Sequence, residues 1–234
     1  MIRFYAPDIL TEGRLPQSDS AHALRVLRMH AGETLEATDG RGNIYTCILA
    51  DENAHGAAVD IVGVRSQPPV WSVPLTVMVA PTKQMERMEW LVEKLVETGV
   101  DRIVPVRCRR SERKEVKTER LEKIAVSAMK QSLKAVLPQV CPMTPLPQAL
   151  SACGDAQKFM GYCDDAVERR LLARSLQPAT ATAILIGPEG DFAPEEVEMA
   201  IDAGFIPVTM GDNRLRTETA ALTAAITFHI INQL

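Results

Sequence analysis

Two glycine-containing strings near the C-terminus combine residue types that could build a ligand site. Residues 187–192 read GPEGDF, and residues 211–220 read GDNRLRTETA. Glycine lets a backbone approach a ligand closely, because it has no Cβ. Arg216 and Glu218 add a cation that can hold an anion and a carboxylate that can take a proton. Neither string has the Gly-Lys-Ser/Thr of a nucleoside-triphosphate loop or the G-x-G-x-x-G of a dinucleotide site, so we expect neither ligand.

A second group of candidate residues is basic. Between Arg102 and Lys134 the chain has eleven Lys and Arg and four Glu, which gives this segment a net charge of +7 in a chain of net charge −4. A local patch, rather than the total charge, is what meets a phosphate backbone. Two interpretations stay open. The segment binds nucleic acid, or it is a solvated helix face with pairs such as Glu119 and Lys123 at the i, i+4 spacing.

Other ligand classes are disfavoured by composition. The five cysteines are scattered and form no C-x-x-C, which argues against a zinc site and a disulfide framework and favours a reducing cytoplasm. We therefore predict no metal. No apolar run approaches 18 residues, so we expect no membrane span. An apolar fraction of 46% with 24% charged residues is typical of a globular chain and excludes a disordered one.

The elements that must position the two strings alternate along the chain. Strands are expected at residues 75–80, 103–106, 158–162, 183–186 and 208–210. Helices are expected at residues 85–96, 120–136, 194–203 and 217–231. This alternation predicts an α/β domain with a mostly parallel sheet. Each glycine-containing string directly follows a strand, and ligands of such sheets bind at the carboxyl ends of strands.

The N-terminal third has a different pattern. Short strands are expected at residues 2–5, 33–38, 43–50 and 57–64, with a helix at residues 20–29. Residues 39–42 read DGRG, which is a turn signal between two strands. Residues 66–69 read SQPP, a stiff connector. We therefore predict two domains, at residues 1–69 and 70–234.

The last predicted helix is apolar on every side, which is typical of a helix buried all round. A partner subunit is the simplest cover for its outer face. A large monomeric core is the alternative.

Several strings together resemble one family. They are IGPEGDF (186–192), LRTETA (215–220), HALRVLR (22–28), DGRG (39–42) and AMKQSLKAVLP (128–138). These strings resemble the RsmE family, bacterial methyltransferases of small-subunit ribosomal RNA in the SPOUT superfamily, over nearly the whole chain. Three positions depart from the family pattern. Asp191 replaces a second Gly, Ala193 replaces a helix-capping Ser or Thr, and Lys130 stands where an acid is more typical.

The resemblance implies more about the fold than alternation does. The N-terminal domain would be a PUA-like β-barrel that helps to bind RNA, and the C-terminal domain would carry a deep trefoil knot. Knots are rare, so this expectation comes from the resemblance alone. The implied enzyme is a homodimer in the cytoplasm that uses S-adenosylmethionine. It would methylate N3 of one uridine in 16S ribosomal RNA, on the assembled or nearly assembled small subunit.

The resemblance also implies site residues. The cofactor pocket would be formed by Ile186, Gly187, Glu189, Gly190, Met210, Gly211, Leu215, Arg216, Thr219 and Ala220. The catalytic candidates are Arg216 and Glu218. Arg216 would hold a carboxylate or a developing anionic carbonyl, or brace the fold through a salt bridge to Glu189 or Glu218. Glu218 would be the base or a charge partner at the helix N-terminus. The candidate RNA contacts are His22, Arg25, Arg28, Arg107, Arg109, Arg110, Arg113 and Lys114.

Three other functions remain open at this point. One is a SPOUT enzyme that methylates a ribose 2′-hydroxyl, which the Thr217-Glu218-Thr219 string disfavours. Another is an RNA-binding factor without catalysis, which cofactor binding would exclude. The third is an unrelated α/β enzyme that acts on a phosphorylated small molecule, whose activity would not depend on ribosomal subunits.

Overall fold

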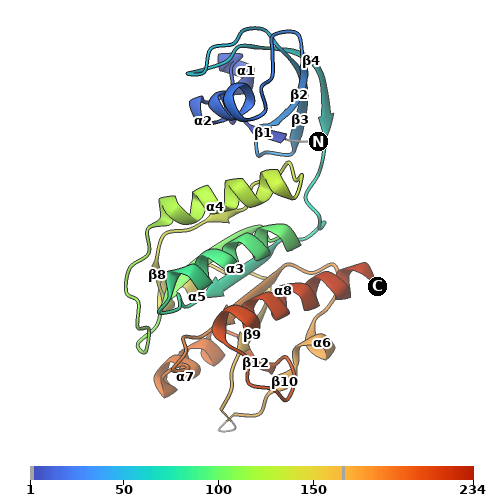
Figure 1. Ribbon diagram of the computed structural model, residues 1–234. Coiled ribbons are helices and arrows are strands. Elements are labelled where there is room, and N and C mark those ends of the chain that lie inside the picture. The colour runs from blue at the N-terminus through green and yellow to red at the C-terminus, as the bar shows by residue number, and fades with distance from the viewer. Residues whose placement is uncertain (1–2, 165–166) are drawn as a thin grey trace. The chain divides into compact units, whose positions relative to one another are not determined.

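The computed structural model describes residues 3–164 and 167–234, and the chain divides into two compact units (Figure 1). The first unit holds the residues up to Val70 together with Val126–Leu137. The second unit holds Trp71–Ala125 and Pro138–Leu234. The boundary predicted after residue 69 assigns residues 126–137 to the second domain, whereas the structure groups them with the first unit.

The first unit is built on a small mixed sheet. Its strand order is β1 (Arg3–Tyr5), β2 (Thr34–Thr38), β3 (Asn43–Leu49) and β4 (Val59–Ser66). Strands β1 and β2 are parallel, whereas the other two pairs are antiparallel, and β1 and β4 are the ends of this strand order. Helices α1 (Ile9–Glu12) and α2 (Gln17–Ala21) come between β1 and β2, and α2 continues into a π-helical turn, η1 (His22–Val26).

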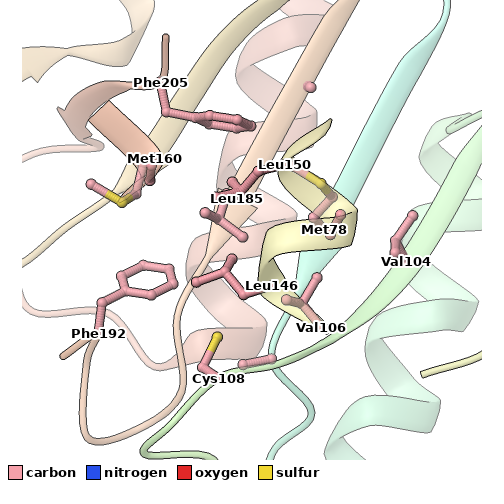
Figure 2. Close-up of a cluster of buried hydrophobic side chains, with 14 of the residues drawn as sticks. Met78, Val104, Val106, Cys108, Leu146, Leu150, Met160, Leu185, Phe192 and Phe205 are labelled. Atoms are coloured by element: carbon pink, nitrogen blue, oxygen red, sulfur yellow. The ribbon is translucent and has the colours of Figure 1, made fainter. Parts of the chain in front are cut away.

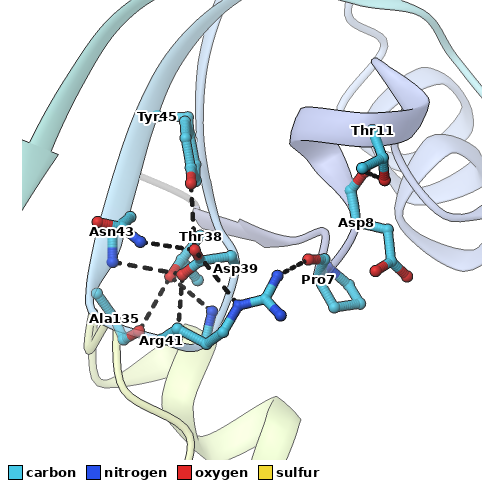
Figure 3. Close-up of polar contacts among 10 residues, drawn as sticks. Pro7, Asp8, Thr11, Thr38, Asp39, Arg41, Asn43, Tyr45 and Ala135 are labelled. Carbon is cyan, nitrogen blue, oxygen red and sulfur yellow. Dashed lines mark hydrogen bonds and ion pairs between the residues drawn. The ribbon is translucent and has the colours of Figure 1, made fainter.

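The predicted turn at residues 39–42 joins β2 to β3 (Figure 3). The carboxylate of Asp39 accepts hydrogen bonds from the backbone N–H groups of Arg41 at 2.8 Å and Asn43 at 3.3 Å. It also accepts one from the Asn43 side chain at 2.7 Å and one from the Tyr45 hydroxyl at 3.1 Å. Gly40 has φ of 76°, the left-handed region that favours glycine, and a Cβ there would lie 2.9 Å from the Tyr5 ring. The side chain of Asp39 therefore fixes this turn.

Residues 126–137 belong to the first unit because they pair with the same turn. The N–H of Gly42 donates to the carbonyl of Ala135 at 2.8 Å, and the N–H of Leu137 donates to the carbonyl of Gly40 at 2.9 Å. The Thr38 hydroxyl also donates to the Ala135 carbonyl, at 3.2 Å. The helix predicted at 120–136 is therefore wrong at its C-terminal end. Helix α4 (Thr118–Gln131) stops earlier, since the following backbone bonds to the turn.

The second unit is built on a parallel sheet. Its strand order is β10 (Arg170–Leu171), β12 (Ile206–Thr209), β9 (Gln157–Gly161), β11 (Thr182–Ile186), β5 (Leu75–Val79), β6 (Arg102–Arg107) and β7 (Gln139–Val140), with β8 (Thr144–Pro145) paired to β6. Every pairing in this sheet is parallel. All five residues of β11 are buried, as expected of a central parallel strand covered on both faces.

Helices cover both faces of this sheet. Helix α8 (Thr217–Gln233) contacts β5 and β11 and packs against α3 (Met85–Thr98). The other face carries α5 (Leu146–Ser151) and α7 (Pro194–Asp202), which contact each other. Figure 2 shows Leu146 and Leu150 of α5 among Met78 and Leu185 of the sheet, and Phe192 belongs to the same buried cluster. This core anchors the loop that leads from β11 into α7.

The predicted fold class is confirmed: a small mixed N-terminal sheet and a parallel C-terminal sheet with helices. The closed β-barrel expected of the N-terminal domain and the trefoil knot stay predictions. The expected all-round burial of the last helix is not met in a single chain, because Ile226 and Ile230 of α8 are 39% and 50% exposed. Short helices α5 and α6 (Leu172–Ser175) were not predicted. In the part of the chain that the structure describes, no helix has the length and hydropathy needed to cross a membrane.

Candidate functional site

A cavity of about 780 Å³ lies where three strands of the parallel sheet end. The loops that follow β9, β11 and β12 line it, so it occupies the carboxyl edge of the sheet, as the sequence predicts. Nine of the ten predicted cofactor residues line the cavity: Ile186, Gly187, Glu189, Gly190, Met210, Gly211, Leu215, Arg216 and Ala220. Thr219 does not line it and is exposed.

The loop after β11 has a specific backbone shape. A Cβ on Gly187 would lie 2.9 Å from the Phe192 ring, so only glycine fits there without a shift. Asp191 has φ of 58°, in the left-handed region. Glycine adopts this conformation most readily, and Asp tolerates it because its short side chain bonds locally. Here the Asp191 carboxylate accepts from the N–H groups of Phe192 at 2.9 Å and Cys163 at 3.2 Å. The departure from the family pattern at this position is thus accommodated.

The second departure, at Ala193, is also accommodated. Ala193 is the residue before helix α7 and has no side chain that can cap it. Glu196 reaches back instead, and one carboxylate oxygen accepts from the Ala193 N–H at 2.9 Å. Its other oxygen accepts from the N–H of Arg109 at 2.7 Å. Glu196 is buried, and it therefore ties the segment after β6 to the start of α7.

The segment after β6 is also tied to the cavity loops by its own arginines. Arg110 donates to the carbonyl oxygens of Gly190 and Phe192, both at 3.1 Å. Arg113 donates to the carbonyl oxygens of Thr82 at 3.4 Å and Lys83 at 2.7 Å. The Lys83 N–H in turn donates to the carboxylate of Glu189 at 3.0 Å. These contacts connect three loops. The basic pattern predicts phosphate contacts at these arginines and does not indicate that they hold the cavity loops.

The two catalytic candidates lie in different surroundings. Arg216 immediately precedes α8, is exposed and lines the cavity. Glu218 is only 7% exposed, lies in the first turn of α8 and does not line the cavity. One of its oxygens lies 3.6 Å from Nη1 of Arg87 on α3, and its other oxygen is buried without a hydrogen-bond partner among the described residues. Neither of the salt bridges considered for Arg216, to Glu189 or Glu218, occurs among the described residues.

The start of α8 is held against the loop after β11. The Thr217 hydroxyl donates to the carbonyl of Gly187 at 3.0 Å. This bond joins the two glycine-containing strings that the sequence singled out. The loop after β9 completes the cavity with Tyr162, Cys163, Asp164 and Arg169, which sequence reasoning missed. The predicted strand before these residues is the signal that could have found them. The carboxyl ends of parallel strands lie at the same edge of a sheet, so the loop after this strand belongs beside the two glycine-containing strings.

The candidate RNA contacts divide between the two units. His22 and Arg25 lie in η1, and Arg28 follows it with φ of 57°. Arg25 and Arg28 are exposed, whereas His22 is half-buried. In the second unit, Arg107, Arg109 and Lys114 line an open groove of about 490 Å³. Arg109 also forms an ion pair with Glu195. Among the described residues, no cluster of His, Cys, Asp and Glu could hold a metal ion.

The chain resembles known proteins in sequence. Residues 69–229 match the family described as an RNA methyltransferase domain, and residues 15–62 match the RNA methyltransferase PUA domain. Ribosomal RNA small subunit methyltransferase E of Mycobacterium bovis is 30% identical over 230 residues, which cover 93% of this chain and 86% of that protein.

Two solved structures resemble the whole chain. A probable rRNA-methyltransferase from Porphyromonas gingivalis has a TM-score of 0.94 and 45% identity, with 100% of this chain and 99% of that chain covered. Ribosomal RNA small subunit methyltransferase E from Neisseria gonorrhoeae, bound to S-adenosyl methionine, has a TM-score of 0.83 and 30% identity. Its alignment covers 99% of this chain and 98% of that chain.

Proposed function

Because the chain belongs to the RsmE family of RNA methyltransferases, with a PUA domain and a SPOUT methyltransferase domain, we propose that it forms 3-methyluridine in 16S ribosomal RNA. S-adenosylmethionine is the methyl donor, and N3 of one specific uridine is the acceptor. The substrate is the assembled or nearly assembled small subunit, which places the protein in the cytoplasm. The enzyme works as a homodimer.

The observation that carries this proposal is the cavity at the carboxyl edge of the sheet. Its volume of about 780 Å³ lies within the range of ordinary cofactor pockets, roughly 300–1,000 Å³. Four Asp and Glu carboxylates and four Arg guanidinium groups line it, and this mixture suits a ligand that carries both a positive sulfonium and a negative carboxylate. Gly187 and Gly190 bring backbone polar groups to the wall of the cavity. When bound, the cofactor supplies an electrophilic methyl group.

Arg216 has the position expected of a group that acts on uracil. The N3 atom of uridine is a weak nucleophile until it loses its proton, and the resulting negative charge spreads over the neighbouring carbonyl oxygens. An exposed guanidinium on the cavity wall can stabilise that charge as it develops. For Glu218 we favour the second of its two roles, as a charge partner at the positive N-terminus of α8, because it is buried beside Arg87.

The test is to incubate the protein with labelled S-adenosylmethionine and small subunits that lack the modification, and then to identify the methylated nucleoside. The expected product is 3-methyluridine. Arg216→Ala should lower the rate of methyl transfer about 10²–10³-fold while cofactor affinity changes little, since the lost interaction is strongest in the transition state. Arg174→Ala, on the exposed side of α6, is the matched control.

Each outcome distinguishes a function. A 2′-O-methylated nucleoside would replace the proposed acceptor with a ribose hydroxyl. Cofactor binding without any methylated product would favour an RNA-binding factor. Equal rates for Arg216→Ala and Arg174→Ala would remove Arg216 from the reacting centre.

A further inference from the structure

Arg110 holds the loop after β11 on both sides of its left-handed residue. Its Nη1 atom donates to the carbonyl oxygens of Gly190 and Phe192, the residues that flank Asp191. The aliphatic stem of Arg110 lies against Gly190, because a Cβ built on that glycine would be 3.6 Å from the Cβ of Arg110. Arg110 and the loop that these contacts hold are both part of the cavity wall. The position of Arg110 therefore affects the shape of the cofactor cavity.

The guanidinium has a second edge that these contacts leave unused. Arginine presents five N–H donors in a planar fork, and its Nε and Nη2 atoms together match a phosphate. No group among the described residues bonds to these two atoms of Arg110, and the side chain is exposed. The neighbouring arginines, Arg109 and Arg113, are already paired within the protein. Arg109 is paired with Glu195, and Arg113 uses both Nε and Nη2 on backbone carbonyls.

We propose that Arg110 is a positioning residue that couples RNA binding to cofactor binding. Its Nε and Nη2 edge binds an RNA phosphate while its Nη1 atom stays on the two loop carbonyls. A phosphate fixes a side chain that otherwise has many rotamers, so RNA orders the loop for the cofactor. By linkage, the cofactor strengthens RNA binding by the same factor. The inference rests on the proposed function, since it needs both substrates to bind.

The test measures this coupling directly on the full-length protein. The ligand is S-adenosylhomocysteine, which cannot react and has no sulfonium charge, and the RNA is that of small subunits that lack the modification. The Kd of each is measured by calorimetry or filter binding with and without the other, over a series of salt concentrations. For the wild-type protein, each ligand should lower the Kd of the other about fivefold or more.

Three variants separate the two edges of the guanidinium. Arg110→Ala should weaken S-adenosylhomocysteine binding alone, reduce the coupling factor to about one and lower the salt slope of RNA binding by about 0.7–0.9. Arg110→Lys keeps the charge but lacks the fork, so it should keep the salt slope and lose the coupling. Arg107→Ala removes a neighbouring cation that does not contact the loop. It should lower the salt slope and keep both the cofactor Kd and the coupling factor.

The outcomes are distinct. A wild-type coupling factor of one, or a wild-type factor retained in both Arg110 variants, would overturn the inference while the proposed function stands. A wild-type protein that binds no S-adenosylhomocysteine and forms no 3-methyluridine would contradict the proposed function itself. Thermal unfolding checks that each variant is folded, and Arg110→Lys carries the test if Arg110→Ala does not fold.

Discussion

The carboxylate of Asp39 accepts four hydrogen bonds at the turn between β2 and β3. Burial by itself would raise the pKa of Asp39, but the hydrogen bonds from Asn43, Arg41 and Tyr45 outweigh it and lower the pKa below its ordinary value. A carboxyl group whose pKa is lower in the folded state stabilises the protein above its unfolded pKa. That stability is lost as pH falls through the folded pKa.

We therefore predict that Asp39→Asn lowers the free energy of unfolding by about 1–3 kcal/mol at pH 7. The difference from the wild type should shrink as pH falls below about 4, because protonation then removes the same charge from the wild-type side chain. Urea unfolding at several pH values measures it. Asp60→Asn, at an exposed position on β4, is the control. A difference that is independent of pH would show that the charge of Asp39 contributes nothing.

At the site, sequence reasoning reached the residues whose function depends on local strings, and it missed those whose function depends on distant partners. The two glycine-containing strings both line the cavity. The contacts of Arg110 and Arg113 are with residues about 80 and 30 positions away, so no local pattern reveals them. Charge alone gave these two arginines the same interpretation as Arg107, whose side chain has no such backbone contact in the part of the chain that the structure describes.

Among the elements, the limits of α4 show where local preference yields to tertiary contacts. Residues 120–136 have a helical pattern, yet the helix ends at Gln131 and Leu133 takes φ of 55°. The backbone beyond it bonds to the turn of the first unit, which lies about 95 residues earlier in the sequence. Long regular strands and helices were predictable from periodicity. Two-residue strands such as β7, β8 and β10 were not, because they are too short to show a period.

The same junction yields a prediction about the stability of β2. Thr38 is fully buried, and its hydroxyl donates to the Ala135 carbonyl and accepts from the Gly40 N–H at 3.1 Å. Thr38→Val keeps the shape of the side chain and leaves that N–H without its acceptor. It should destabilise the protein by about 1–3 kcal/mol in denaturant unfolding.

The control for this prediction is Thr46→Val on β3, whose hydroxyl makes no side-chain hydrogen bond among the described residues. Its effect should stay within about 0.5 kcal/mol. Equal effects of the two substitutions would mean that the Thr38 hydroxyl does not stabilise the junction.

At the scale of the whole molecule, the outer face of α8 is the surface that the proposed homodimer would bury. Ile226 and Ile230 are 39% and 50% exposed on a helix whose other side is buried in the core. A second copy of the chain would remove these side chains from water, at roughly 25 cal/mol per Å² of apolar surface.

We predict a particle of twice the 25.7 kDa chain mass at micromolar concentration. Ile230→Asp should shift the mass toward the monomer, because a charge at a buried interface is costly. Light scattering measures both. Val62→Asp, at a 58% exposed position on β4, should leave the mass unchanged. A wild-type protein of monomeric mass would contradict the proposed assembly.

The contribution of residues 126–137 to the first unit has a consequence for protein synthesis. The ribosome makes the chain from its N-terminus, and domains ordinarily fold as they emerge. The turn at residues 39–42 leaves the ribosome before residues 71–125 have been made, and its partner carbonyl at Ala135 comes later still. The first unit therefore begins to fold first, but it cannot complete its fold until residues 126–137 have been made. A nascent chain that stalls before residue 126 exposes an unfinished N-terminal unit to chaperones and proteases, however well its own sheet has formed.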